Sequence, residues 1–110
     1  MRQIEWDKYE VALLIESVIK ISNESVIRSD ELRSLSELLR KRAVKLGMHI
    51  DDEFRNYNGM TLQAAAIESL LFLDKGTRHH SHLFEEMVNL YKADLDKYKI
   101  ILADAHKQSE

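Results

Sequence analysis

Proline is absent from this chain of 110 residues, and glycine occurs only at Gly47, Gly59 and Gly76. Proline and glycine are the residues that most often interrupt helices or turn the backbone. A chain with so few of them favours helices joined by short connections. Its apolar residues recur at helical spacing, so the sequence predicts an all-α fold: a compact bundle of about five helices in a single domain, residues 1–110.

The strongest helix start lies at Asp7. Asp7 suits the N-cap position, Glu10 stands three residues further on to complete a capping box, and Trp6 is placed to pack against Val11 as a hydrophobic staple. The helix is predicted to run from about residue 8 to residue 22 and to face the core with one apolar side. That side consists of Val11, Leu14, Ile15, Val18 and Ile21.

A second helix is predicted from about residue 29 to just before Gly47, a residue suited to a left-handed C-terminal cap. Its apolar stripe is narrow and consists of Leu32, Leu35, Leu39, Ala43 and Leu46. The periodicity fails from residue 48 to 60, which predicts a turn and an ordered loop with positive φ at Asn58-Gly59. A third helix, from about residue 61 to 74, has broad apolar coverage, so we expect it to be central.

Two further helices are predicted after Gly76. Ser81 is expected to cap the fourth helix, whose apolar residues are Leu83, Phe84, Met87, Val88 and Tyr91. The fifth helix is expected from about Asp94, with the apolar residues Leu95, Tyr98, Ile101, Leu102 and Ala105. The tail from residue 107 to 110 is expected to fray.

Several classes of protein are excluded by composition. The chain has no cysteine, so neither a disulfide framework nor a thiolate metal site is possible. Its apolar runs are shorter than the roughly 20 residues of a membrane span, and its first residues lack the apolar core of a signal peptide. We therefore expect a cytoplasmic protein with no membrane contact. The formal charge of −3 does not favour indiscriminate binding to phosphate backbones.

Catalytic chemistry finds little support in the sequence. Asp51, Asp52 and Glu53 form the one acidic cluster considered for a metal ion, but no second cluster follows at a spacing typical of nucleases. Helix capping or arginine pairing suits these residues better. No serine stands in a glycine-flanked elbow, and no glycine-rich loop could cradle a phosphate. The sequence predicts a protein that is not an enzyme and has no cofactor.

Three histidines lie close together as His79, His80 and His82. His79 and His82 could share one side of a helical turn and offer imidazole ligands to zinc or nickel. Since no cysteine is present, only another histidine or a carboxylate could complete a tetrahedral site. A solvated loop is the preferred interpretation, and no metal is predicted.

A basic arc on the second helix is the clearest candidate contact surface. It consists of Arg33, Arg40, Lys41 and Lys45, which lie away from the leucine stripe. Such an arc can follow a phosphate backbone. Glu37 interrupts it, however, and lysines near the end of a helix are ordinary complements of the helix dipole, so a solvated face is the alternative.

The loop after the second helix carries a distinctive string. Leu35-Ser36-Glu37-Leu38-Leu39-Arg40-Lys41-Arg42-Ala43, then Ile50-Asp51-Asp52, then Phe54-Arg55-Asn56-Tyr57-Asn58-Gly59-Met60, resembles a small helical module of bacterial and phage proteins that often precedes nuclease domains of restriction or HNH type. Trp6 to Val11 and Leu83 to Tyr91 resemble it too. The resemblance implies an accessory unit that positions nucleic acid or a partner. No nuclease domain is present in this sequence, so cleavage is not implied.

Within this string the resemblance makes Arg55, Asn56 and Asn58 candidate contact or loop-fixing residues. Tyr57 lies between the two asparagines in the predicted loop, where we expect its side chain to point outward. A purely structural interpretation is also open. In that interpretation Arg55 pairs with Asp51 or Asp52, and Asn58 caps the third helix.

The leading hypothesis is a non-enzymatic binding module that contacts nucleic acid or a nucleic-acid-handling protein in a bacterial or phage restriction or defence setting. The predicted contact residues are Arg33, Arg40, Lys41, Lys45, Arg55, Asn56, Tyr57 and Asn58. The alternative is a protein–protein inhibitor or scaffold, such as a phage anti-defence protein, that acts through an acidic surface. A homo-oligomer is a third hypothesis, because helices with wide apolar coverage often need a neighbour.

Overall fold

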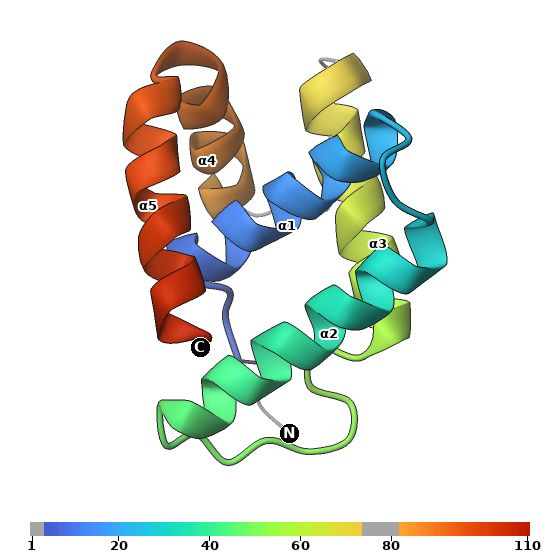
Figure 1. Cartoon of the computed structure of the whole chain (residues 1–110), viewed down its shortest axis with the longest axis vertical. Helices are drawn as coiled ribbons and strands as arrows, with labels where there is room; N and C mark the ends of the chain where they lie inside the picture. Colours follow the sequence, from blue (N-terminus) through green and yellow to red (C-terminus); the bar gives the residue numbers. More distant parts are fainter. Residues whose placement is uncertain (1–3, 74–81) are drawn as a thin grey trace.

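The first helix lies at the centre of the molecule. In the computed structural model, which describes residues 4–73 and 82–110, α1 (Lys8–Ser22) contacts α2, α3, α4 and α5. Figure 1 shows α1 crossing the middle of the bundle, with α5 beside one end and α3 beside the other. The described residues form helices and no strand, so the predicted all-α fold with five helices is confirmed.

The predicted bounds and cap of α1 are confirmed. The carboxylate of Asp7 accepts the N–H of Glu10 at 2.9 Å, and the carboxylate of Glu10 accepts the N–H of Asp7 at 3.1 Å. This reciprocal pair satisfies two of the N–H groups that the start of a helix leaves free. Trp6, just outside the helix, packs edge-on against Phe84, with ring centroids 5.5 Å apart. Its contact with Val11 stays a prediction.

Helix α2 spans Arg28–Lys45 and ends as predicted, with Gly47 in the left-handed region at φ 82°. Four residues of the expected stripe are buried: Leu32, Leu35, Leu39 and Ala43. The fifth, Leu46, was assigned wrongly, because it caps the end of the helix and is exposed.

The third helix begins earlier than predicted. α3 spans Tyr57–Glu68 and continues into the π-helical turn η1, Ser69–Leu73. The cap is Asn56, whose side chain accepts the N–H of Gly59 at 2.8 Å. The predicted loop to residue 60, its turn with positive φ at Asn58-Gly59 and the capping role of Asn58 are therefore wrong, since both residues lie inside the first helical turn.

Helices α4 (His82–Ala93) and α5 (Leu95–Gln108) complete the bundle. Asp94 caps α5 by accepting the N–H of Lys97 at 3.2 Å, whereas Leu95 is exposed and does not belong to the core. Ser81, the predicted cap of α4, lies outside the described residues. The tail does not fray as predicted: α5 reaches Gln108, and the buried Ser109 donates its hydroxyl to the carbonyl of Ala105 at 2.8 Å.

Tyr98 joins α5 to α1 inside the core. Its side chain is buried, and its hydroxyl donates to the carbonyl of Ala12 at 2.8 Å. Burial raises the pKa of Tyr98, and the negative charge of Glu16 raises it further. The folded state therefore holds this proton more tightly than the unfolded state does.

This pKa shift predicts a specific loss of stability in alkali. The contribution of the Tyr98 proton to stability is fully present below the pKa of tyrosine in the unfolded chain, about 10. Above that pH it is lost by up to about 1.4 kcal/mol per pH unit. We expect Tyr98→Phe to weaken this alkaline loss while lowering the neutral-pH free energy of unfolding by about 1 kcal/mol. Urea unfolding across the alkaline range measures both. Tyr57→Phe, which keeps Tyr98, is expected to retain the loss, and an equal effect of both variants would contradict the assignment.

Candidate interaction surfaces

Arg55 turns inward and forms a buried ion pair. Its Nε lies 2.7 Å from Glu10 Oε2 and its Nη2 donates to Glu10 Oε1 at 3.0 Å, with 8% and 5% of the two side chains exposed. Nη2 also donates to the carbonyls of Ile4 and Glu5, each at 3.2 Å. The predicted pairing with Asp51 or Asp52 is wrong, because Arg55 ties the loop to the start of α1 instead.

Aromatic rings enclose the same guanidinium. The Arg55 guanidinium carbon lies 4.5 Å from the ring centroid of Trp6 and 4.4 Å from that of Phe54. Cations are attracted to aromatic faces, and the attraction strengthens when water is excluded. Arg55 adopts φ 48°, which a residue with a side chain rarely does, so these contacts hold the backbone in a strained conformation.

The remainder of the loop is also fixed internally. The carboxylate of Asp51 accepts the N–H groups of Glu53 at 3.0 Å and Phe54 at 2.9 Å, which fixes a turn rather than capping a helix. Arg40 donates from Nη1 to the carbonyls of Asp51 and Phe54, at 3.0 and 2.5 Å. Ser36 donates to the carbonyl of Arg55 at 2.6 Å. Arg40 thus holds the backbone of the loop between α2 and α3, and Arg55 joins that loop to the segment before α1.

The other predicted contact residues differ in exposure. Arg33 lies over the ring of Tyr57, 4.4 Å from its centroid, and Tyr57 is partly buried rather than pointing freely outward. Asn56 caps α3. The predicted residues that remain exposed are Arg33, Lys41, Lys45 and Asn58.

Arg42 is a structural residue that the sequence reasoning missed. Its side chain is 5% exposed, its Nη1 lies 3.0 Å from Asp7 Oδ2, and its Nε and Nη2 donate to Gln108 Oε1 at 3.1 and 2.7 Å. It therefore joins α2 to the start of α1 and the end of α5. The available signal was its spacing, since Arg42 follows Leu39 by three residues and so continues the buried stripe.

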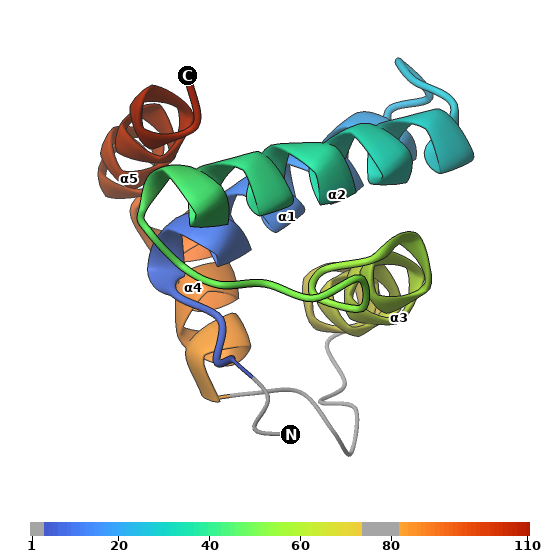
Figure 2. The ribbon, with the colours of Figure 1, turned by 90° about the horizontal axis from the view of Figure 1, so that it is seen from below.

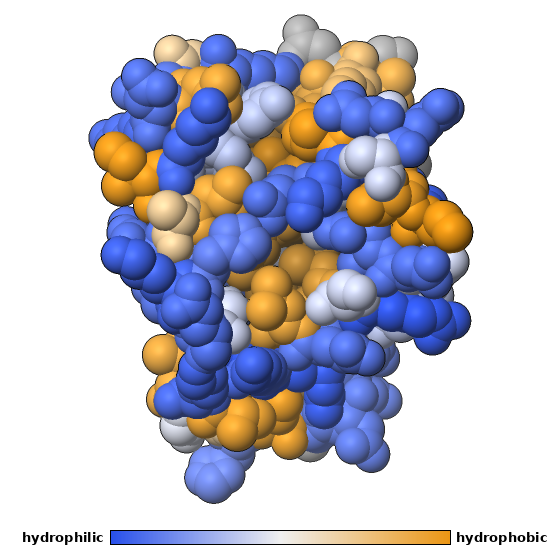
Figure 3. Space-filling view, in the orientation of Figure 1, coloured by the Kyte–Doolittle hydropathy of each residue, from blue (hydrophilic) through white to orange (hydrophobic). Residues whose placement is uncertain are grey.

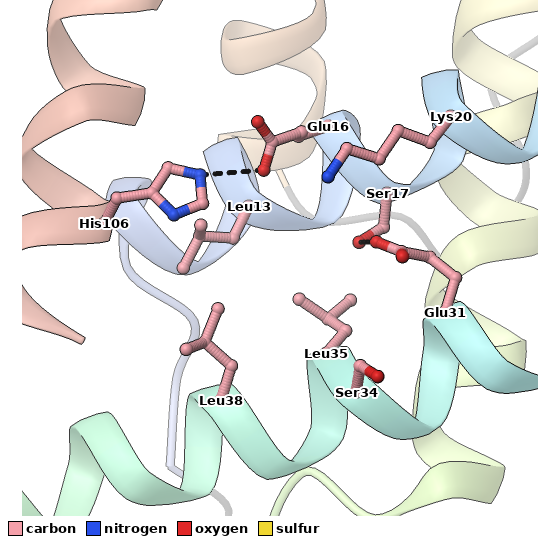
Figure 4. A pocket seen from close by; sticks show the side chains of 9 residues that line it. All are labelled: Leu13, Glu16, Ser17, Lys20, Glu31, Ser34, Leu35, Leu38 and His106. Atoms are coloured by element: carbon pink, nitrogen blue, oxygen red, sulfur yellow. Dashed lines mark hydrogen bonds and ion pairs between the residues drawn. The ribbon is translucent and has the colours of Figure 1, made fainter. Parts of the chain in front are cut away.

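A hollow of about 250 Å³ lies between α1, α2 and α5. Its floor is apolar and includes Leu35 and Leu38 (Figure 4). Figure 3 shows apolar surface between α1 and α2 with hydrophilic residues around it. On the rim His106 contacts Glu16 at 2.8 Å. Pockets for drug-sized ligands enclose about 300–1,000 Å³, so this open hollow is small for such a ligand.

The buried hydroxyl and the two carboxylates of this hollow already have partners. Ser17 donates its hydroxyl to Glu31 at 2.6 Å, which links α1 to α2. The contact of His106 with Glu16 links α5 to α1. Both carboxylates are therefore committed to contacts between helices, and the hollow presents no buried polar group that requires a ligand.

An apolar surface lies on the outer side of α3 and η1. The seventeen residues from Tyr57 to Leu73 contain a single charged residue, Glu68. Their inner side is buried at Met60, Ala64, Ile67 and Leu70. The opposite side is exposed, by 71% at Leu62, 52% at Phe72 and 65% at Leu73. We call Leu62, Ala65, Phe72 and Leu73 the outer face.

The outer face corrects the expectation that the third helix is central. Figure 2 shows α3 at one side of the bundle, away from α5. α3 contacts α1 and α2. Its broad apolar coverage therefore reflects one face in the core and another at the surface.

One ion pair borders the outer face. Arg28 donates two hydrogen bonds to the carboxylate of Glu68, at 2.9 and 3.0 Å, and this contact raises the pKa of Arg28. Both side chains are partly exposed. Ile27, next to Arg28, is exposed by 67%, so the border adds apolar surface and no net charge.

Within residues 4–73 and 82–110, no group of three or more histidine, aspartate and glutamate side chains is placed to hold a metal ion. His82 is exposed at the start of α4, while His79 and His80 lie outside the described residues. None of the described helices has the length and hydropathy needed to cross a membrane.

Fold and surface together define a small five-helix bundle with an exposed apolar face on α3 and η1. No protein family model, curated protein or solved structure matches the chain.

Proposed function

We propose that this chain is a non-enzymatic protein-binding module whose contact surface is the outer face. The observation that carries the proposal is the exposure of three large apolar side chains on one side of α3 and η1. Burial of apolar surface is favourable by about 25 cal/mol per Å². Contiguous apolar surface on a folded protein is typical of protein interaction sites.

The helix pattern supports the same proposal. A helix with apolar residues on two opposite sides is normally covered on both of them. α3 and η1 are covered by the rest of the chain on their inner side, and a protein partner would cover the outer side. The proposal belongs to the same class as an inhibitor or scaffold, but it places the contact on the outer face rather than on an acidic surface.

Paired substitutions test the outer face directly. We expect the double variant Leu62→Glu, Phe72→Glu to lose affinity for co-purifying protein partners by more than about tenfold, because charges would be buried without counterparts. The measurement compares capture from a cell lysate by tagged wild-type and variant chains, followed by titration of the captured protein.

Ile100→Glu provides a control on another helix, since Ile100 on α5 is 65% exposed, a value between those of Phe72 and Leu62. This variant is expected to retain its partners. Equal capture by the wild-type chain and the outer-face variant would refute the proposal.

Nucleic-acid contact through α2 is a second candidate. Arg33, Lys41 and Lys45 are exposed and belong to one i+4 row, which winds by about 120° around α2 and also contains the exposed Glu37. The setting in restriction or defence depends on the resemblance of the Phe54 to Met60 string. In this chain Arg55 from that string is engaged in the buried pair with Glu10.

The second candidate makes a quantitative prediction. Three phosphate contacts predict that log affinity for duplex DNA falls against log salt with a slope of about −3. We expect Lys41→Glu combined with Lys45→Glu to abolish this binding in a fluorescence-anisotropy titration. The control is Lys97→Glu combined with Lys99→Glu on α5. Unchanged affinity in the α2 variant would exclude this face.

A further inference from the structure

We propose that Asn58 is a site of spontaneous deamidation, and that the cap of α3 controls how fast this reaction runs. Asn58 stands directly before Gly59, whereas the other asparagines of the chain, Asn23, Asn56 and Asn89, do not precede a glycine. The reaction requires only water and the two neighbouring residues. It needs neither a partner nor the outer face, so this site is independent of the proposed function.

Deamidation at this pair closes a succinimide ring. The backbone nitrogen of Gly59 gives up its proton and attacks Cγ of Asn58, so that a C–N bond forms. The side-chain amide takes up a proton through water and leaves as ammonia. Water then adds to either carbonyl of the ring and opens it. The product is aspartate or isoaspartate, depending on which carbonyl is attacked.

Glycine at position 59 leaves the attacking nitrogen uncrowded, because it has no Cβ. The structure gives a separate reason for glycine here. A Cβ at this position would lie 3.1 Å from Asn56 Oδ1, which is closer than ordinary van der Waals contact. The cap of α3 therefore favours glycine at position 59. The reactive Asn-Gly pair follows from the tight cap.

The side chain of Asn58 is open to water. It is exposed in the first turn of α3, and among residues 4–73 and 82–110 its carboxamide has no hydrogen-bond partner. Water can reach Cγ, and no contact of this side chain has to break before it rotates towards the backbone. The side chain itself is therefore ready to react.

The backbone of the pair is closed to the reaction. The N–H of Gly59 donates to Asn56 Oδ1 at 2.8 Å, so the attacking nitrogen holds its proton in a hydrogen bond. The carbonyl of Asn58 accepts the hydroxyl of Thr61 at 2.7 Å. The succinimide ring includes the Cα–C bond of Asn58 and fixes ψ outside the helical range. The first turn of α3 must therefore open before the ring can close.

The cap thus sets the rate through the population of the open turn. Helix ends open locally at a lower free energy than the whole domain unfolds. Loss of an N-cap raises the population of an open first turn by about fivefold. Removing the acceptor on Asn56 is therefore expected to speed deamidation at Asn58 by about the same factor.

The two products affect α3 differently. Aspartate at position 58 places a negative charge in the first turn, which the helix dipole favours. Isoaspartate adds a methylene carbon to the backbone, so the helical hydrogen bonds cannot continue through it and the first turn stays open. Leu62 lies one turn after Asn58 on the same side of α3, so either product brings a charge to the edge of the outer face.

Peptide mapping by mass spectrometry, during incubation at mildly alkaline pH, locates and times the modification. In the folded wild-type chain Asn58 is expected to lose its amide before Asn89, which precedes leucine. Asn56→Ala is expected to accelerate the loss about fivefold. Asn56→Asp keeps an acceptor for the N–H of Gly59 and is expected to retain the wild-type rate. Equal rates at Asn58 and Asn89 overturn the site, and an Asn56→Ala chain no faster than Asn56→Asp overturns control by the cap.

Amide exchange at Gly59 tests the same control without any substitution, and so remains informative if circular dichroism shows that Asn56→Ala does not fold. Increasing urea below the unfolding transition is expected to raise Gly59 exchange and Asn58 deamidation in proportion, because both require the bond to Asn56 to break. Deamidation that stays constant while Gly59 exchange rises overturns control by the cap.

Discussion

Replacing Arg55 by alanine is expected to lower the free energy of unfolding by about 3–5 kcal/mol. The substitution leaves the carboxylate of Glu10 buried without its cation, and a buried unpaired charge is strongly destabilising. It also removes the donor that the carbonyls of Ile4 and Glu5 share. The segment before α1 and the loop before α3 are expected to loosen together.

Chemical denaturation monitored by circular dichroism measures this loss. Arg33→Ala removes an exposed arginine over Tyr57 and is expected to lose less than about 1 kcal/mol. Adding Glu10→Gln to Arg55→Ala is expected to recover part of the loss, since a neutral amide is less costly to bury. If Arg55→Ala and Arg33→Ala were equally mild, the buried pair would not anchor the loop.

The backbone of Arg55 allows one further comparison. Its φ of 48° costs a residue with a side chain about 1 kcal/mol, whereas glycine adopts this conformation readily. Arg55→Gly is therefore expected to be less destabilising than Arg55→Ala, although both remove the ion pair. The opposite order would show that the positive φ is not maintained in solution.

Leu14→Ala is expected to lower the free energy of unfolding by about 2–5 kcal/mol. Leu14 is 0% exposed on α1, the helix that contacts all four others. Loss of the side chain removes apolar burial and leaves a cavity, because helices packed on several sides cannot all close inward. Thermal and urea unfolding are expected to agree on this loss.

Alanine substitution at Leu62 tests whether this residue contributes to the core or lies on the outer face. Leu62→Ala is expected to change stability by less than about 0.5 kcal/mol, since this leucine is 71% exposed. Such a result would show that Leu62 contributes little to folding of the single chain. A loss as large as that of Leu14→Ala would place Leu62 in the core and contradict its role in binding.

The predicted contact residues illustrate why sequence spacing alone does not separate exposed arginines from structural ones. Arg40 and Arg55 were expected to face a ligand, yet both hold the loop between α2 and α3 through internal contacts. Lys41 and Lys45 follow the expected arc. An arginine that binds phosphate and an arginine that binds backbone carbonyls have the same sequence context, because both functions use the same donors.

The third helix illustrates a different limit. Its apolar coverage was read correctly from Leu62 to Leu73, but the expected central position was wrong. Hydrophobic spacing shows which sides of a helix are apolar. It does not show whether a given side is covered by the same chain or by another one.

Local chemistry within the sequence determined the all-α fold, the bounds of α1 and the ending of α2. These features depend on residues at most four positions apart, such as Asp7 and Glu10, and local contacts of this kind can be read directly. Tertiary structure alone decided which arginines face inward and which helix face remains open. Arg55 meets Glu10 from 45 positions away, and Arg42 meets Gln108 from 66. Such contacts are set by how the helices pack. From the sequence alone, many distant carboxylates and amides are equally good partners for an arginine.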